Sequence, residues 1–167
     1  MDSRLERLQS AIVSAINDLT PSDLARRREG KWSVAEILEH LYRTYTGTIK
    51  GFQRCLEAGK PLAASPTWAQ RVKIAFVVQL GRMPRGAEAP PQARPQGIPG
   101  EKVRADIAAQ IAAMDAIIAQ CESRWGTQTR LLSHPLLGPL SGSQWRKFHL
   151  VHGMHHLRQI RELTTIN

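Results

Sequence analysis

Four histidines lie within eight consecutive positions near the end of the chain, in the stretch HLVHGMHH at residues 149–156. On a helix of about 100° per residue, His149, His152 and His156 fall on one side, whereas His155 lies apart from them. Two imidazoles at i and i+4, the spacing of His152 and His156, can reach one metal ion from consecutive helical turns. The pattern therefore indicates part of a metal site, packed core histidines or a proton-linked surface patch.

A metal inside a helical bundle needs further ligands from a facing helix. In the first hundred residues the one histidine is His40, in an apolar-periodic segment where an imidazole is an unusual choice. Glu36, one turn earlier, could supply a carboxylate as an alternative ligand. With Ser33 it also fits the S-x-x-E capping box, which we favour because the spacing is correct. Spacing alone does not decide between a metal site and ordinary packing.

The elements that must position these histidines are helical. Apolar residues recur at three- and four-residue steps in five segments, at about 5–16, 33–59, 67–80, 101–125 and 143–163. Ser141 or Ser143 is expected to cap the last of them. We find no sustained period-two alternation and no hairpin dipeptide, so the prediction is one all-α domain over residues 1–167. Its architecture is expected to be a four-helix bundle with one short extra helix.

Two segments read as connections between these helices. Five of the ten prolines of the chain fall within residues 81–100, which predicts a loop insertion, either a lid or a disordered segment. The stretch SHPLLGPLSG, at residues 133–142, is expected to be a turn-rich connector.

The amino-acid composition limits the classes of protein to which the chain can belong. The chain has 167 residues, 42% hydrophobic and 22% charged, with a formal net charge of +9. The basic residues are spread along the chain and aromatic residues make up only 5%, so we favour a solvated basic surface over a nucleic-acid partner. No stretch approaches the roughly 20 apolar residues that span a bilayer. The N-terminus lacks a signal-peptide core, and Cys55 and Cys121 are too few for a disulfide framework, so a cytoplasmic location is expected.

Two stretches, KWSVAEILEHL (31–41) and GSQWRKFHLVHGMHHLRQI (142–160), resemble the signature helices of the DinB/YfiT-like superfamily. Members of that superfamily are four-helix bundles that carry a divalent metal on three histidines. The first pattern, W-S-x-x-E-x-x-x-H, is matched here by Trp32, Ser33, Glu36 and His40. The second pattern, H-x-x-x-H-x-x-Q, is matched by His152, His156 and Gln159. The connector before the last helix also resembles that of an uncharacterised branch of the superfamily.

The resemblance implies that His40, His152 and His156 bind a divalent metal, which in such families is nickel, zinc or iron. It leaves His149 and Gln159 as neighbours of the ligands, with His149 also an alternative ligand. Three imidazoles leave open positions on the metal for water or substrate. Such a site can lower the pKa of bound water toward about 7 and support hydrolysis, or it can bind a thiolate.

The superfamily includes thiol-dependent S-transferases, so a small anionic thiol cofactor is one candidate substrate. Arg146 and Arg158 lie on the last helix and could hold such an anion, although plain surface arginines are the simpler interpretation. No residue pattern identifies a catalytic acid, base or nucleophile.

Three hypotheses follow. The favoured one is a metal-dependent transferase or hydrolase. The second is a metal-binding bundle without catalysis, such as a dimeric stress-related protein. The third is a basic interaction module that contacts anionic lipid or nucleic acid through the 67–80 helix and the loop near Arg82 and Arg85.

Overall fold

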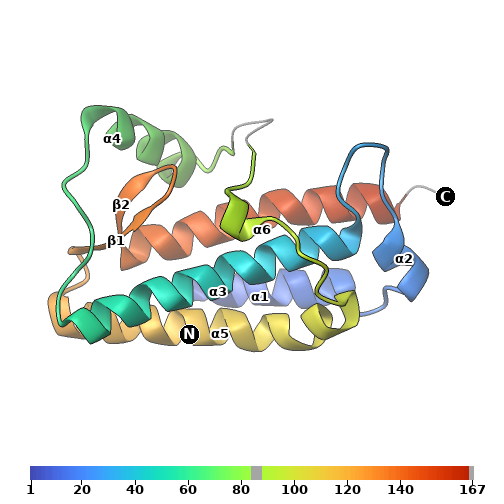
Figure 1. Ribbon diagram of the computed structural model, residues 1–167, viewed down its shortest axis with the longest axis horizontal. Helices are drawn as coiled ribbons and strands as arrows, with labels where there is room; N and C mark the ends of the chain where they lie inside the picture. The colour runs from blue at the N-terminus through green and yellow to red at the C-terminus, as the bar shows by residue number, and fades with distance from the viewer. Residues whose placement is uncertain (84–87, 166–167) are drawn as a thin grey trace.

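The computed structural model describes residues 1–83 and 88–165. Four long helices lie side by side, with their axes roughly along the longest axis of the molecule (Figure 1): α1 (Ser3–Ile16), α3 (Val34–Ala58), α5 (Gly100–Trp125) and α6 (Gly142–Thr164). Helix α3 packs mainly on α5, and α1 packs mainly on α6. The short helix α2 (Pro21–Ala25) joins α1 to α3. None of the helices in these ranges is both long and apolar enough to cross a membrane.

The predicted apolar stripes form the core between the four long helices. On α1 the buried residues are the four of the predicted stripe, Leu5, Leu8, Ile12 and Ile16. The α5 stripe is likewise buried, at Val103, Ile107, Ile111, Met114 and Ile118. Both cysteines, Cys55 and Cys121, are buried free thiols. The burial of large apolar side chains on these faces is the main source of stability that holds the helices together.

Local capping fixes where the two histidine-bearing helices begin. Ser33 and Glu36 form the predicted capping box at the start of α3, and Gly59 ends the helix with a φ of 66°. At the start of α6 the cap is Ser141 rather than Ser143, and its box partner is Gln144. These caps bind backbone N–H groups that have no partner within the helix. They fix the residue at which each helix begins and therefore the direction in which its histidines point.

A small β-hairpin interrupts the helical pattern. Strands β1 (Arg130–His134) and β2 (Gly138–Ser141) pair antiparallel, so the prediction of a purely all-α chain with a turn-rich connector was wrong here. The strands are too short for a recognisable alternation, and every residue of β2 is buried. The indole N–H of Trp145 donates to the Leu132 carbonyl at 3.1 Å, which attaches the hairpin to α6.

The predicted 67–80 helix is confirmed, as α4 (Trp68–Ile74) followed by a π-helical turn η1 (Ala75–Gln79). It stands beside the hairpin, on one side of the four long helices (Figure 1). Gly138, with a φ of 81°, lies against the Gln70 side chain so closely that a Cβ there would collide with it. Glycine at this turn therefore permits the hairpin to pack under α4.

The proline-rich loop is held against α3 by a buried carboxylate. Glu39, 1% exposed, accepts hydrogen bonds from the backbone amides of Gln96, Gly97 and Ile98 at 2.6, 3.0 and 3.1 Å. The same loop contains the 3-10 turn η2 (Pro91–Ala93). Residues 92–98 of this loop therefore contact α3. Arg85 lies outside the described residues.

Replacing Glu39 with glutamine tests this attachment. Hydrogen bonds to a charged acceptor contribute about 1.5–3 kcal/mol. A glutamine side chain has only one oxygen to accept from the three backbone N–H groups, and its NH₂ group cannot accept. We expect Glu39→Gln to speed hydrogen exchange of the amides at residues 96–98 by about tenfold or more. The matched control is Glu57→Gln, at an exposed position of the same helix. Equal exchange in both variants would contradict the role assigned to Glu39.

Candidate metal centre

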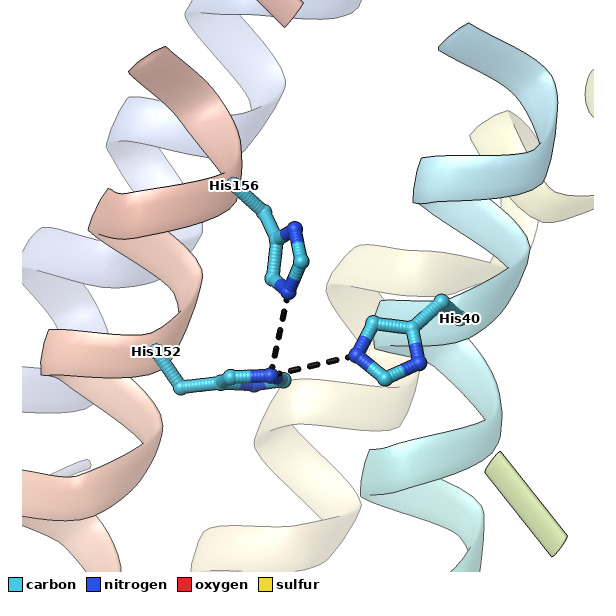
Figure 2. Close-up of side chains that lie close together, drawn as sticks. All are labelled: His40, His152 and His156. Atoms are coloured by element: carbon cyan, nitrogen blue, oxygen red, sulfur yellow. Dashed lines mark hydrogen bonds between the residues drawn. The ribbon is translucent and has the colours of Figure 1, made fainter. Parts of the chain in front are cut away.

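Three buried histidines from two helices point at one another. His40 comes from α3, and His152 and His156 come from consecutive turns of α6 (Figure 2). The Nε2 atom of His152 lies 3.1 Å from Nε2 of His40 and 3.1 Å from Nε2 of His156. One ligand atom from each of the three residues lies within 4.8 Å of the other two. The three candidate ligands of the sequence are therefore brought together.

The orientation of the His40 ring is set from the loop. Its Nδ1 lies 2.8 Å from the carbonyl oxygen of Ala93, which belongs to η2. A carbonyl can only accept, so His40 carries its hydrogen on Nδ1 and donates it to Ala93. The lone pair of His40 therefore sits on Nε2 and faces the other two rings.

Gln159 performs the same task for His156. The Oε1 atom of Gln159 lies 2.7 Å from Nδ1 of His156, and its Nε2 lies 3.3 Å from Nε2 of His155. The amide accepts from His156 and donates to His155, so the hydrogen of His156 is on Nδ1 as well. Its lone pair also points from Nε2 toward the centre of the cluster. Gln159 lies where the superfamily pattern expects a neighbour of the ligands.

This arrangement suits a cation better than it suits hydrogen bonding. Two lone pairs converge on Nε2 of His152, which carries one hydrogen at most and cannot satisfy both acceptors well. Ligands about 2.1 Å from a tetrahedral zinc ion are separated by about 3.4 Å, close to the observed 3.1 Å. The Nδ1 atom of His152 is buried without a hydrogen-bond partner in the described residues. The donor set of three imidazoles fits a divalent transition metal.

Burial keeps the three imidazoles neutral. Desolvation lowers the pKa of His40 and, with the neighbouring rings, lowers that of His152 well below its ordinary value. The pKa of His156 falls to about 3, mainly through desolvation and then through His40. Neutral imidazoles keep their lone pairs at pH 7, which is the state that binds a metal.

The cluster opens onto a groove with a volume of about 1630 Å³. The groove runs between α3, α6, the hairpin and the loop, and all three histidines line it. Two aromatic rings flank the cluster: Trp32 lies 5.1 Å from the His40 ring, and Phe148 stacks on His152 at 5.3 Å. The site therefore combines buried nitrogen donors with space for a molecule of substantial size.

The groove is predominantly cationic. It is lined by three glutamates and by six basic residues, Arg28, Lys31, Arg43, Lys50, Arg54 and Arg94. Arg43 is fixed by hydrogen bonds to the Gln96 side chain and the Gln92 carbonyl, both at 3.0 Å. A surplus of cations along such a wall favours an anionic ligand. Sequence reasoning missed Arg43, Lys50 and Arg54 because charged residues at helical spacing usually form a solvated face. It missed Arg28, Lys31 and Arg94 because they lie outside the helices.

The two arginines considered as substrate contacts, Arg146 and Arg158, do not line this groove. Arg146 is buried and forms ion pairs of 2.6 Å with Asp115 and with Glu122. Arg158 is exposed. Both lie six residues from His152, which places each of them about 120° from His152 around the helix.

Two further candidates are also turned away from the three histidines. His149 is buried and lies 3.1 Å from the Thr48 hydroxyl, which donates its own hydrogen to the Thr44 carbonyl. His149 must then donate from Nε2, so this atom is not a free ligand. Glu36 accepts from the Ser33 amide at 2.6 Å and pairs with Arg27. It serves the capping box and is not a ligand.

Sequence reasoning missed three residues around the site. His134, on β1, has its ring 4.4 Å from Phe148 and 5.3 Å from Trp145, and burial lowers its pKa to about 4. The hairpin brings it to the groove, and no spacing in the sequence indicates that approach. Glu39 lies next to His40 in a segment whose pattern predicts burial. An unpaired carboxylate is rarely buried, so its position could have indicated that Glu39 has a hydrogen-bond partner. Ala93 contributes only its carbonyl, which no side-chain pattern can reveal.

Fold and site together define a helical domain with a buried cluster of three histidines beside a cationic groove. Comparison with known families shows that the chain belongs to the family DUF1569, described as a protein of unknown function, whose model matches residues 1–163. None of the curated proteins matches the chain.

The ion cluster of Arg146 yields a stability prediction. Removing one partner of a buried ion pair leaves an uncompensated charge and costs about 3–5 kcal/mol. We expect Arg146→Met to lower the free energy of unfolding by about that amount, because Asp115 and Glu122 stay buried. Arg158→Met, on the exposed side of the same helix, is expected to change it by less than about 0.5 kcal/mol. Urea unfolding measures both, and similar values for the two variants would refute a structural role.

Burial of neutral histidines outside the cluster predicts acid sensitivity. The pKa of His149 is lowered to about 3 by desolvation, from an ordinary value of 6.5. Below pH 6.5 the unfolded chain binds a proton at this residue and the folded chain does not. Stability should therefore fall with pH, by up to about 1.4 kcal/mol per pH unit for this group, until about pH 3.

The variant His149→Gln isolates this contribution. In a buffer with a metal chelator, urea unfolding between pH 7 and pH 5 is expected to show a shallower pH dependence than in the original chain. His155→Gln is the control, since His155 is only partly buried and contributes less. A slope that His149→Gln leaves unchanged would argue against a neutral buried His149.

Proposed function

We propose that this chain is a divalent-metal-dependent enzyme of the DinB/YfiT-like type, acting as a thiol S-transferase or a hydrolase. In this proposal His40, His152 and His156 hold the metal. The observation that carries it is the convergence of three buried Nε2 atoms, two of which have their lone pairs fixed toward the centre. Hydrogen bonding among neutral imidazoles gives no reason for that arrangement, whereas a cation does.

The arrangement of the long helices supports the same proposal. A DinB-like four-helix bundle carries its histidines on the second and last long helices of the bundle. Here the candidate ligands lie on α3 and α6, which are the second and fourth long helices in chain order. Trp32 and Gln159, which belong to the two sequence patterns, contact His40 and His156, and Ser33 caps the helix that carries His40.

A metal at this position would supply either a water of lowered pKa or a binding site for a thiolate. The residues of the chain would provide the rest. The Ala93 carbonyl and Gln159 hold the rings of His40 and His156 in one tautomer. Trp32 and Phe148 cover two sides of the cluster and limit the access of bulk water.

The cationic groove supports a small anionic thiol as the substrate. Lys50 and Arg54 line the groove on α3 and are exposed, so their side chains can move to contact an anionic group. Arg43 lies on the same helix between these residues and His40, and its guanidinium is already oriented by the loop. A carboxylate-bearing thiol bound along this wall would direct its sulfur toward the histidines.

The alternative is a metal-binding protein without catalysis. Structural zinc sites are closed, with four protein ligands, whereas this cluster offers three and adjoins an open groove. This difference makes an enzyme the better proposal.

Metal analysis tests the first part of the proposal. We expect the untagged protein to contain close to one equivalent of nickel, zinc or iron by elemental analysis. The variant His152→Ala/His156→Ala is expected to lose the metal, because one imidazole cannot retain it. His155→Ala, which alters the neighbouring histidine on the same helix, is expected to retain it. Equal metal content in the original chain and the double variant would end the metal interpretation.

Activity of the metal-loaded protein tests the second part. Small anionic thiols with an electrophile, and separately simple esters and amides, are the substrates to assay. Activity that disappears in His152→Ala/His156→Ala and weakens in Lys50→Gln/Arg54→Gln is the expected result. A protein that binds metal stoichiometrically and turns over neither class would support the non-catalytic alternative.

A further inference from the structure

The helix α4 and the turn η1 present an apolar stripe to solvent. Trp68, Val72, Phe76 and Leu80 recur at four-residue steps and are 80%, 49%, 43% and 66% exposed. Large hydrophobic residues are usually exposed singly, whereas these four follow one line along twelve residues of helix and the position after it. The stripe is therefore a surface that needs an explanation.

The stripe is not the core-facing side of this helix. Ile74, Val77 and Val78 are the residues that α4 and η1 bury against the rest of the protein. With about 100° per residue, Ile74 lies on the side of α4 opposite Val72. The segment thus has two apolar faces, one packed and one without a partner in the described residues.

The charges around the stripe are of one sign. From Ala58 to Ala87 the sequence contains no aspartate or glutamate. The exposed cations of this segment within the described residues are Lys60, Arg71, Lys73 and Arg82. On the helix Arg71 lies about 60° to one side of Trp68, and Lys73 lies about 100° to the other side of Val72. The stripe is therefore flanked by a cation on each side.

We propose that this stripe, Trp68, Val72, Phe76 and Leu80 with its flanking cations, docks onto the surface of an anionic phospholipid bilayer. An apolar helix face bordered by Lys and Arg is the arrangement that lies in a membrane interface, with the apolar residues among the acyl chains. Tryptophan is enriched at that depth, and the flanking cations are positioned to meet lipid phosphates. This inference does not depend on the metal centre.

Other occupants match the surface less well. A second copy of the chain, docked through the same face, would bring Arg71 and Lys73 of both copies together without a carboxylate from this segment to offset them. A nucleic acid would meet Val72, between the two aromatic residues, and Leu80 beyond them, and neither side chain can stack on bases. A protein with an acidic amphipathic helix is the remaining competitor, and the experiment is designed to expose it.

The test is co-sedimentation of the purified 167-residue protein with vesicles. Binding is expected to vesicles of equimolar phosphatidylglycerol and phosphatidylcholine, to weaken with added salt, and to be much weaker with phosphatidylcholine alone. Val72→Ser/Phe76→Ser is expected to lower the affinity about tenfold or more, since both apolar groups leave the interface. Arg71→Gln/Lys73→Gln is expected to lower it about fivefold for each cation removed.

Two matched controls distinguish the effect of the stripe from the effects of the total charge and of the total exposed apolar surface. Arg7→Gln/Arg161→Gln removes the same net charge from exposed positions on α1 and α6, and Val13→Ser removes an apolar side chain that is 41% exposed. Both are expected to bind vesicles like the original chain. All substituted positions are exposed, and unchanged thermal unfolding will show that each variant is folded.

Several outcomes overturn the proposal. They are no binding to anionic vesicles, equal binding to neutral vesicles, and equal losses in the control and stripe variants. Self-association without lipid that Val72→Ser/Phe76→Ser abolishes would assign the stripe to a second copy instead. Capture of an acidic amphipathic peptide that anionic vesicles do not displace would assign it to a protein partner.

Discussion

The hydrogen bond from His40 Nδ1 to the Ala93 carbonyl is the interaction on which the site depends. It selects one of two tautomers and thereby decides which nitrogen of the ring faces α6. Without it the His40 lone pair could turn to the loop, and the pair on α6 would lack its third partner. A backbone atom in a proline-rich loop thus controls the chemistry of a side chain on a long helix.

Helix α6 serves different neighbours around its circumference. One side carries the histidines. A second side places Arg146 between Asp115 and Glu122 of α5 and, two turns further along, approaches α1 so closely that a Cβ at Gly153 would collide with Leu8. The ion cluster and the glycine contact fix the rotation of the helix about its axis. That rotation brings His152 and His156 to face α3, so the packing of this second side of α6 positions the cluster.

Periodicity made part of this structure predictable. Helical geometry places His152 and His156 on one face, and a capping box marks the start of α3, but the choice of His40, His152 and His156 as one ligand set came from the resemblance to the DinB/YfiT-like superfamily. The hairpin was not predicted because both strands are short and because every residue of β2 is buried, which removes the alternation of apolar and polar residues. The ion pairs of Arg146 could not be predicted, because its carboxylate partners come from a helix whose rotation the sequence does not reveal. The role of the Ala93 carbonyl could not be predicted, because a contact made by a backbone atom does not depend on the type of residue.

Glu39 and His40 are consecutive residues, and both hold the same loop, one through three amides and the other through a carbonyl. Ordering of the loop and occupancy of the three-histidine centre are therefore linked equilibria. Under the proposed function, an ion that binds the oriented rings strengthens the attachment of the loop, and a loop already attached raises the affinity for the ion by the same factor. A solute that pulls residues 91–98 away from α3 would act as an antagonist of the metal without touching any of its ligands.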